Sequence, residues 1–256
     1  MAKSIKKKHQ DIFQIYGVNG SSNIIEAKKI NIIRIDLMVG GVAEKKPWIN
    51  DILRNKKFPV HRLPKTQFLQ KYSGKRTQGI VISFTGKIIQ NIPSLKNMEK
   101  NICLLAVDNI EDPQNLGQII RRSECAGVEG LIIPEHGNVQ TTNAVLQVSQ
   151  GAFVHISIYR CGNLHQQLLS LKKDGFWIVG VENSVKAMDW YQLDYNRKLV
   201  LVMGSEGKGI RPVIRKTCDI LVTIPMQGKL NSLNVSATVS AVLFERNRQM
   251  LQTCTN

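Results

Sequence analysis

The stretch that decides the fold is LVLVMGSEGKGI, residues 199–210. Its first five residues form a continuous apolar run without polar alternation, which is typical of a strand buried on both faces of a parallel sheet. Three glycines then surround Glu206, and glycine permits close backbone approach and positive φ angles. Because ligands of open α/β sheets bind beyond the carboxyl ends of the strands, this loop is a candidate binding site.

The same kind of apolar run recurs through the second part of the chain. Strands are predicted over residues 102–107, 131–134, 154–159, 176–181, 199–203 and 220–224. Helices are predicted between them over residues 116–125, 164–173 and 213–217, with a long last helix over 236–251. The alternation predicts an α/β domain whose parallel sheet is covered by helices.

The first part of the chain reads as a smaller α/β domain. Helices are predicted over residues 24–29, over 47–54 and from Pro64 onwards, and strands over 32–39 and 79–84. Residues 86–100 combine Pro93 with scattered polar residues and are expected to be a linker. The expected domains are therefore residues 10–85 and 101–254, on either side of that linker.

Positive charge is concentrated in the first two fifths of the chain. Of a formal net charge of +16, residues 1–100 carry +14, from 20 Lys and Arg against 6 Asp and Glu. Lysine and arginine that neutralise phosphates release condensed counterions, so a polyanion such as RNA is the expected partner, with a solvated basic surface as the alternative. The opening segment MAKSIKKKHQ, residues 1–10, is expected to be a basic arm that touches RNA, or else a short organellar targeting peptide.

Cysteine and histidine usage argues against a disulfide framework and against a metal site. The five cysteines are odd in number and far apart, no Cys-x-x-Cys occurs, and the five histidines show no ligand spacing. No apolar run reaches the roughly 18 residues of a membrane span. We therefore expect a cytoplasmic protein that uses neither a metal nor a membrane.

Two further loops follow predicted strands and lead towards helices. DNIEDPQNLGQIIRR, residues 108–122, places Arg121 six residues after Asn115, under two helical turns, so both are candidates for one site. IPMQGKLNSLNVSA, residues 224–237, bends at Pro225 and Gly228 before the last helix. Taken alone, each loop is also explained by a capping Asn or Ser at a helix start.

The glycine loop matches neither of the common nucleotide-binding motifs. A P-loop needs Gly-x-x-x-x-Gly-Lys followed by Ser or Thr, but Lys208 is followed by Gly209. The dinucleotide fingerprint Gly-x-Gly-x-x-Gly is also absent from this loop, and no glycine-rich loop follows the first strand as in Rossmann-type methyltransferases. A nucleotide-hydrolysing protein is therefore disfavoured.

Together and in this order, the three loops resemble the three motifs of the SpoU, or TrmH, family of RNA ribose 2′-O-methyltransferases. Those motifs are Asn-x-Gly-x-x-x-Arg after a strand, Gly-x-Glu-x-x-Gly, and Pro-Met-x-Gly running into Ser-Leu-Asn-Val-Ser. The matching residues are Asn115, Gly117 and Arg121, then Gly204, Glu206 and Gly209, then Pro225, Met226, Gly228 and residues 232–236. The match spans the whole second part of the chain.

The resemblance implies a catalytic domain with a deep trefoil knot of the SPOUT type, which sequence logic alone would not propose because knots are nearly absent from proteins. It implies S-adenosylmethionine as the cofactor, no metal, and a homodimer whose active site lies near the interface, where the long last helix packs. The implied cofactor-binding residues are Gly204, Ile224, Met226 and Leu233. The implied catalytic residues are Asn115, Arg121, Glu206, Ser232 and Asn234.

The implied reaction is attack of a ribose 2′-hydroxyl on the sulfonium methyl, and the family assigns activation of that hydroxyl to the residue that is here Arg121. A free guanidinium rarely deprotonates, so we expect Arg121 to grip the neighbouring phosphate and to stabilise charge developing on the 2′-oxygen. Asn115 is expected to orient Arg121 or the ribose, and Glu206 to hold the local network by hydrogen bonds. Ser232 and Asn234 are expected to position the nucleotide or to support Arg121.

The first domain carries a second resemblance. YGVNGSSNIIEA, residues 16–27, looks like the opening of the L30e-like RNA-binding domain that precedes the catalytic part in bacterial enzymes methylating a guanosine of large-subunit (23S) ribosomal RNA. One departure is Arg76-Thr77-Gln78-Gly79, where relatives often have His before Gln-Gly. The expected substrate is therefore a guanosine in 23S ribosomal RNA. The alternatives are a transfer-RNA guanosine and a non-catalytic RNA-binding or ribosome-assembly protein.

Overall fold

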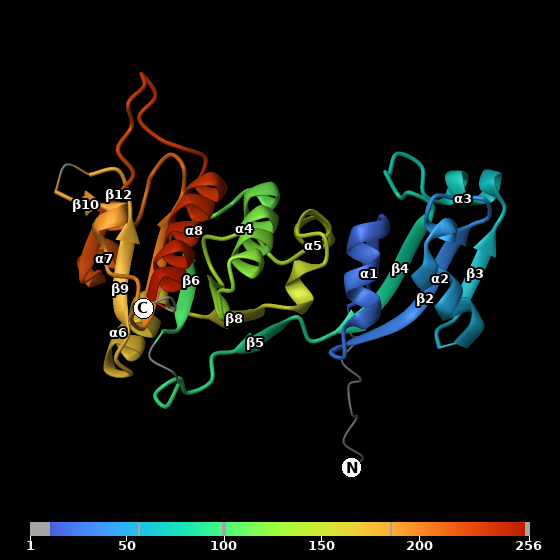
Figure 1. Ribbon diagram of the computed structural model, residues 1–256, viewed down its shortest axis with the longest axis horizontal. Coiled ribbons are helices and arrows are strands. Elements are labelled where there is room, and N and C mark those ends of the chain that lie inside the picture. The colour runs from blue at the N-terminus through green and yellow to red at the C-terminus, as the bar shows by residue number, and fades with distance from the viewer. Residues whose placement is uncertain (1–10, 56, 99–100, 185, 254–256) are drawn as a thin grey trace, which may run out of the picture. The chain divides into compact units, whose positions relative to one another are not determined.

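The computed structural model describes residues 11–55, 57–98, 101–184 and 186–253 of the chain. The chain divides into two compact units, one up to Lys87 and one from Ile88 onwards, and each is described by itself (Figure 1). The basic arm expected over residues 1–10 lies outside the described residues.

The first unit is a four-stranded sheet with helices. Its elements are β1 (Phe13–Tyr16), α1 (Val18–Glu26), β2 (Ile30–Met38), the 3₁₀ turn η1 (Ala43–Lys45), α2 (Pro47–Asn55), β3 (Val60–Leu63), α3 (Lys65–Lys71) and β4 (Ile80–Gly86). The strand order is β1-β4-β2-β3, with β4 antiparallel to both of its neighbours and β3 parallel to β2. The strands β1 and β3, of four residues each, were not predicted.

The first helix was predicted in the wrong place. It covers Val18–Glu26 and not residues 24–29, because Ala27 is already extended. Gly17, at a φ of 88°, turns the chain into the helix without a capping side chain of its own. The Gln78 side-chain oxygen accepts from the Val18 N–H at 2.8 Å and takes the role of a cap. A partner 60 residues away in the chain cannot be seen in a local pattern.

The second unit is built on an eight-stranded sheet in which every recorded strand pair is parallel. Its elements up to the middle of the unit are β5 (Ile89–Asn91), β6 (Cys103–Asp108), α4 (Pro113–Cys125), β7 (Gly130–Pro134), α5 (Asn143–Val148), η2 (Ala152–Val154), β8 (Ser157–Cys161) and α6 (Leu164–Lys173). The remaining elements are β9 (Trp177–Val181), β10 (Met188–Asp189), η3 (Trp190–Gln192), β11 (Leu199–Gly204), α7 (Pro212–Thr217), β12 (Ile220–Thr223) and α8 (Val235–Thr253). The predicted α/β class with a parallel sheet is confirmed.

Three predicted boundaries in the second unit differ from the structure by three residues or more. Part of the predicted linker is the edge strand β5, which pairs with β8 at Ile89 and Ile158, so residues 89–91 belong to the second unit's sheet. The strand predicted from residue 154 begins at Ser157, because residues 152–154 form a 3₁₀ turn after Gly151 at a φ of 88°. The helix predicted from residue 116 begins at Pro113.

Helices cover both faces of this sheet. On one face the leucines of α6 and Ile214 of α7 pack on alternate residues of the central strands. The residues that the strands β6, β7, β8, β9 and β11 contribute to that core are Leu104, Ala106, Ile132, Tyr159, Cys161, Ile178, Val200 and Val202. On the other face α8 contacts β11 and packs beside α4 (Figure 1). Burial on both faces explains why the predicted strands are continuous apolar runs.

The strand order creates a reversal in the middle of the sheet. The order is β10-β12-β9-β11-β6-β7-β8-β5, so that β6 has β7 on one side and β11 on the other. Open α/β sheets bind ligands at the carboxyl ends of two neighbouring strands whose following connections run to opposite sides of the sheet. The loops after β6 and β11 are therefore the place where a site is expected.

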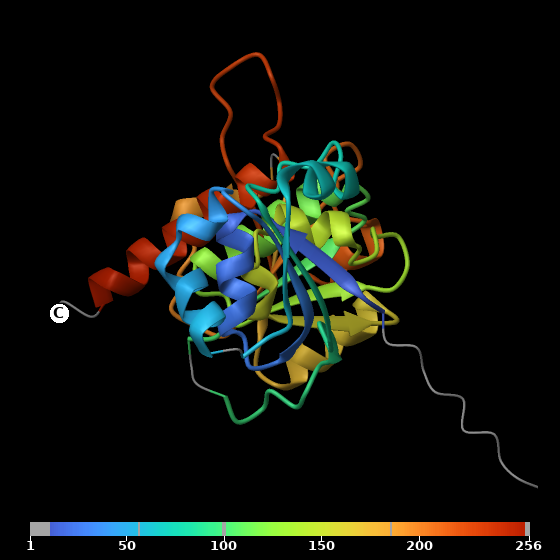
Figure 2. The same cartoon turned by 90° about the vertical axis from the view of Figure 1, so that its right-hand side faces the viewer.

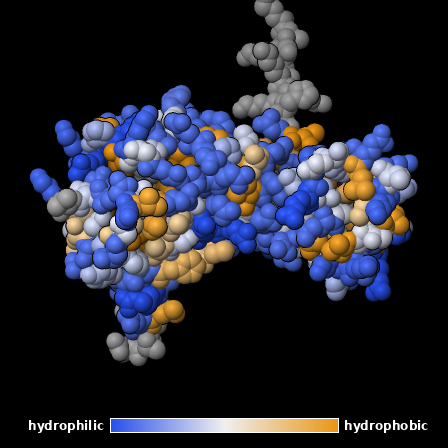
Figure 3. Space-filling view, turned by 90° about the horizontal axis from the view of Figure 1, so that it is seen from above, coloured by the Kyte–Doolittle hydropathy of each residue, from blue (hydrophilic) through white to orange (hydrophobic). Residues whose placement is uncertain are grey.

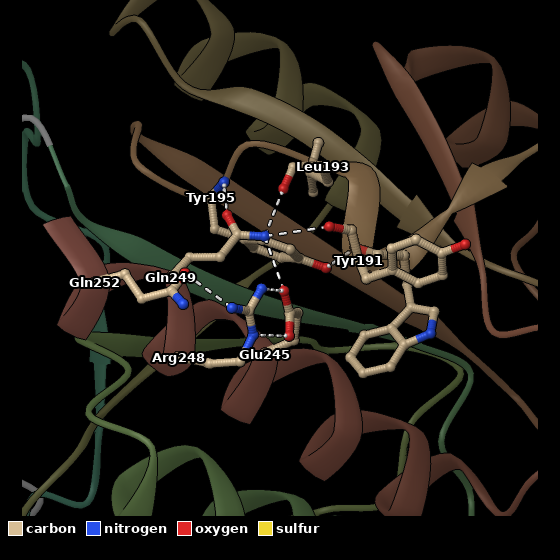
Figure 4. Close-up of polar contacts among 8 residues, drawn as sticks. Tyr191, Leu193, Tyr195, Glu245, Arg248, Gln249 and Gln252 are labelled. Carbon is tan, nitrogen blue, oxygen red and sulfur yellow. Dashed lines mark hydrogen bonds and ion pairs between the residues drawn. The ribbon is translucent and has the colours of Figure 1, made fainter.

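The C-terminal half of α8 is fastened to the segment that precedes β11 (Figure 4). The Gln249 amide donates to the Leu193 carbonyl at 3.0 Å, and its oxygen accepts from the Tyr195 N–H at 3.1 Å. Glu245 accepts from Gln249 and from two nitrogens of Arg248. The hydrogen bond from Arg248 is the main cause that lowers the pKa of Glu245, whereas burial raises the pKa of Tyr195. These contacts fix the entry to the strand that carries the glycine loop.

The connection between β12 and α8 projects from the second unit as a long loop (Figures 1 and 2). Hydrophilic residues predominate on the face shown in Figure 3, and apolar residues gather there in separate patches. Within the described residues, no helix combines the length and the apolar character that a membrane span requires.

Candidate active site

A cavity of about 780 Å³ lies at the carboxyl ends of β9, β11 and β12. Its walls are the segments 181–184 and 203–210 together with Pro212, Arg215, Thr223, Ile224, Met226, Asn231, Ser232, Leu233, Val235 and Thr238. The four residues that the family resemblance implies for the cofactor, Gly204, Ile224, Met226 and Leu233, all line it. This is the edge of the sheet at which α/β proteins bind small molecules.

The glycine loop folds back on itself beside the cavity. Ser205 and Gly209 form an antiparallel bridge, with N–H to carbonyl distances of 3.2 and 2.9 Å. A Cβ placed on Gly204 would lie 2.1 Å from the carbonyl carbon of Gly209, so only glycine fits there. Gly209 itself has a φ of 63°, a conformation that favours glycine. The tight turn presents Glu206 at its tip.

Three of the predicted catalytic residues, one from each motif, meet at this tip. The Asn115 side-chain nitrogen donates to Oε1 of Glu206 at 2.9 Å. The Asn234 nitrogen donates to the same oxygen at 2.5 Å and to the Asn115 oxygen at 2.9 Å. Asn115 and Glu206 are separated by 91 positions in the sequence, and Asn115 and Asn234 by 119. No local sequence pattern could predict these contacts. The two amides bind Oε1 of Glu206. Because the carboxylate is planar, fixing Oε1 also fixes the direction of Oε2.

Asn234 is at once a helix cap and a member of this network. Its Oδ1 accepts from the Ser236 N–H at 2.9 Å at the start of α8. Because the cap uses the oxygen, the amide nitrogen must point the other way, towards Glu206. The capping role is confirmed, and the same side chain also contacts Glu206.

Asn115 does not cap α4, although its position near the start of the helix made that role an alternative. The cap of α4 is Asp112, whose Oδ1 accepts from the Gln114 N–H at 2.9 Å, followed by Pro113 at the first helical position. This leaves the Asn115 side chain free for Glu206. Gly117 permits close packing of α4 on α5, since a Cβ there would lie 2.5 Å from Cβ of Val148.

A buried carboxylate that sequence reasoning missed anchors the glycine loop. Asp108 at the end of β6 is fully buried and accepts from the Arg211 N–H at 2.9 Å and from its Nε at 2.7 Å. The pair bridges the loops after β6 and β11, which are neighbours in the sheet but 103 residues apart in sequence. An apolar strand ending in an acidic residue was the available signal.

Replacing Asp108 with alanine should destabilise the second unit by about 1–3 kcal/mol, since Arg211 would lose three charge-assisted contacts. Urea unfolding measures the loss. The matched control is Asp194→Ala, because the Asp194–Arg197 pair is solvent-exposed and should contribute no more than about 1 kcal/mol. Equal losses from both variants would contradict the anchoring role.

A second pair on the cavity wall was also missed. Glu182 accepts from Nε of Arg215 at 2.8 Å, which joins the end of β9 to α7. Beside it, the Asn183 side chain donates to the Asn231 carbonyl at 2.6 Å and ties the long loop to the same wall. Glu182 and Asn183 directly follow a predicted strand, so the rule that sites lie after strand ends was sufficient to mark these two.

A smaller cavity of about 270 Å³ lies on the other side of the glycine loop, between the ends of β6 and β11. It is lined by Asn109, Ile110, Glu111, Asp112, Asn115, Ser205, Glu206, Gly207, Lys208 and Val235. Glu206 belongs to the walls of both cavities. A group bound in one cavity therefore faces a group bound in the other across this residue.

Two predicted catalytic residues do not join the network. Arg121 is exposed on α4 and lines neither cavity, and within the described part of the chain it has no hydrogen-bond or ion-pair partner. Six residues of helix leave its side chain pointing about 120° away from that of Asn115 and carry it about 9 Å along the axis. Ser232 is exposed and lines the larger cavity.

Among the described residues there is no group of three or more His, Cys, Asp and Glu that is arranged to hold a metal ion. The polar groups that line the two cavities are side-chain amides, hydroxyls, backbone N–H groups, the carboxylates of Glu111, Asp112, Glu182 and Glu206, and the cations of Lys208 and Arg215. This set can orient a hydroxyl and bind a small polar molecule.

Comparisons with known proteins agree on one family. The model of the SpoU rRNA methylase family matches residues 103–244. A Staphylococcus aureus protein, assigned by name to the TrmH family of tRNA/rRNA methyltransferases, is 35% identical in an alignment 207 residues long that covers 78% of this chain and 83% of that protein.

Solved structures share the fold. The S-adenosylmethionine-bound rRNA methyltransferase of Sinorhizobium meliloti has a TM-score of 0.75 at 21% identity, covering 93% of this chain and 88% of that one. The TrmH/SpoU tRNA modifying enzyme of A. aeolicus has a TM-score of 0.55 at 28% identity, covering 62% of this chain and 80% of that one.

Proposed function

This chain belongs to the SpoU (TrmH) family of RNA methyltransferases, and from that premise we propose that it methylates the ribose 2′-oxygen of a guanosine in 23S ribosomal RNA, with S-adenosylmethionine as methyl donor. The observation that carries the proposal is that Asn115 and Asn234 hold Glu206, which lies on the wall shared by the two cavities. A methyl donor in one cavity and an acceptor ribose in the other would meet there.

The larger cavity suits the cofactor. Its apolar residues, Ile210, Ile224 and Leu233 among them, offer a surface for an adenine ring, and its glycine loop brings backbone groups close to a ligand. The opposite charges of Glu182 and Arg215 match the ammonium and carboxylate of the methionine end. S-adenosylmethionine would supply a methyl carbon bonded to a positively charged sulfur. As the 2′-oxygen bonds to that carbon the C–S bond would break, the sulfur would keep the electron pair in neutral S-adenosylhomocysteine, and the hydroxyl proton would be released to water.

The network acts by orientation. Two amides hold Oε1 of Glu206, so its carboxylate has a fixed direction and its second oxygen can accept a hydrogen bond from the substrate. A hydroxyl held in line with a methyl carbon and its leaving sulfur reacts faster because the entropy of alignment has already been lost on binding. Ser232, on the wall of the cofactor cavity, is placed to position the nucleotide.

Arg121 is proposed to grip the phosphate beside the target ribose and to stabilise negative charge on the 2′-oxygen. Its exposure and its lack of a partner in the described residues leave the guanidinium available for RNA. Replacing Arg121 with alanine should lower kcat by about 100-fold or more and leave cofactor affinity within a few-fold of wild type. Single-turnover methylation and calorimetry with the cofactor measure the two effects. Near-normal turnover would remove Arg121 from the mechanism.

We further propose a homodimer, with α8 at the interface and the active site beside it. Since Arg121 lines neither cavity of its own chain, the partner copy is the expected source of this residue for each site. Dimers mixed from Arg121→Ala and Glu206→Ala chains test this arrangement. If the sites are shared, the mixture regains part of the wild-type activity, whereas sites built from single chains stay inactive.

The domain assignments complete the proposal. Residues 10–85 are proposed to be an L30e-like RNA-binding domain, and residues 101–254 to be the catalytic domain with a trefoil knot. Support for an RNA-gripping first domain comes from its charge, since residues 10–85 carry 13 Lys and Arg against 5 Asp and Glu.

Ribosomal RNA is favoured over transfer RNA as the substrate, because the fold of a solved rRNA methyltransferase matches more of this chain than the fold of a solved tRNA enzyme does. The S. meliloti rRNA methyltransferase shares its fold over 93% of this chain, and the A. aeolicus tRNA enzyme over 62%. The test is incubation of the protein with labelled S-adenosylmethionine and, separately, unmodified 23S ribosomal RNA and transfer RNA. Labelled 2′-O-methylguanosine in ribosomal RNA alone is expected. Label in transfer RNA alone would overturn the substrate and keep the enzyme class.

A further inference from the structure

The smaller cavity contains one carboxylate that the rest of the molecule does not use. Asp112 caps α4 through its Oδ1, and Glu206 is held by two amides. Glu111, in contrast, is exposed at the cavity wall and has no hydrogen-bond or ion-pair partner among the residues that the structure describes. A free carboxylate beside the proposed acceptor site is available to a ligand.

The backbone around Glu111 is held in place. Asn109 has a φ of 62°, and the Ile110 N–H donates to the side chain of Asn138 at 2.8 Å. On the other side, Asp112 and Pro113 fix the first turn of α4. The residue thus stands between two anchored positions, at the reversal of strand order between β6 and β11. An anchored backbone narrows the range of positions from which the Glu111 side chain can reach a ligand in the cavity.

The chemistry of a carboxylate selects one base. Its two oxygens accept hydrogen bonds and donate none, so the best partner presents two adjacent donors. Guanine does this with its N1–H and 2-amino group on the Watson–Crick edge. Adenine and cytosine present one amino donor beside a ring acceptor that repels the second oxygen, and uracil presents a single N–H between two carbonyls. Enzymes that act on an extruded nucleotide read the base through this edge.

We propose that the smaller cavity takes the target nucleoside and that Glu111 selects guanine there, by accepting hydrogen bonds from its N1–H and 2-amino group. The inference rests on the proposed function, since it assumes that the acceptor ribose lies beside Glu206. It adds a specificity-determining residue that lies outside the three family motifs. Lys208 on the opposite wall carries a positive charge that suits the nearby phosphate or the guanine O6.

The experiment compares the wild-type protein with Glu111→Gln and Glu111→Ala, on the RNA fragment in which wild type places its methyl group. Each protein is tested with guanosine and with inosine, which lacks the 2-amino group, at the target position. The control is Glu135→Gln, because Glu135 is an exposed glutamate of the same unit that lines neither cavity. Calorimetry with S-adenosylmethionine verifies that the cofactor cavity is intact.

Wild type and the control should prefer guanosine to inosine by roughly 10-fold or more in kcat/KM. Both Glu111 variants should lose about 10- to 100-fold on guanosine and should discriminate little between the two nucleosides, with unchanged cofactor affinity. Unchanged kcat/KM and unchanged discrimination in Glu111→Gln would overturn the inference. So would wild-type methylation of a nucleotide other than guanosine, which leaves the methyltransferase activity standing. Absence of methyl transfer to any RNA by wild type would overturn the proposed function and the inference together.

Discussion

A Gly204→Ala variant should bind S-adenosylmethionine about 10- to 100-fold more weakly than wild type. The added Cβ would lie 2.1 Å from the carbonyl carbon of Gly209 and 2.3 Å from its oxygen. Neither strand of the turn can move away easily, because Ser205 and Gly209 are bridged by two backbone hydrogen bonds. The glycine loop must therefore change its conformation, and the wall of the larger cavity, which this loop forms, changes with it. Calorimetric titration with the cofactor measures the effect.

The matched control is Gly207→Ala in the same loop. A Cβ at Gly207 meets no heavy atom within 4 Å, and the residue does not have a positive φ. Its cofactor affinity should stay within a few-fold of wild type. If both variants bind equally well, the close approach at Gly204 is not what shapes the pocket.

A Glu206→Ala variant should lose about 100-fold or more in kcat while binding the cofactor nearly as well as wild type. The substitution removes the common acceptor of Asn115 and Asn234, so two amide groups at the shared wall lose their orientation. The cofactor cavity keeps most of its walls, which belong to other segments. Single-turnover kinetics under saturating cofactor separate the two effects.

The conservative variant Glu206→Gln gives this prediction a sharper form. Its amide oxygen can still accept from Asn115 and Asn234, so the network keeps its geometry and loses only a charge. Its kcat should therefore lie between those of wild type and Glu206→Ala. If Glu206→Gln is as inactive as Glu206→Ala, the negative charge matters more than the orientation of the network.

The central sheet was predictable because strands buried on both faces appear in the sequence as continuous apolar runs. The prediction located five strands to within about one residue, because each coincides with a continuous apolar run. They are β6, β7, β9, β11 and β12. β1, β3 and β5 were missed because they are short and their sequences, FQIY, VHRL and IQN, contain no continuous apolar run. Helix α1 was misplaced because its start depends on Gln78, which only the folded chain brings near.

The candidate site was predictable in its parts but not in its connections. The motif resemblance selected Asn115, Glu206 and Asn234, and the structure brings these three into direct contact. The Asp108–Arg211 anchor was out of reach, because it depends on β6 lying beside β11. The role proposed for Arg121 depends on a second copy and an RNA strand, and a single chain contains neither.

Alkaline digestion of the methylated RNA tests the central claim most directly. Alkali cleaves RNA through the free 2′-hydroxyl, so a 2′-O-methyl group protects the bond that follows it. After reaction with methyl-labelled S-adenosylmethionine and 23S ribosomal RNA, the label should be recovered in alkali-resistant dinucleotides that begin with guanosine. Label in single nucleotides would mean that the methyl group is on a base, and that a ribose 2′-oxygen is not the acceptor.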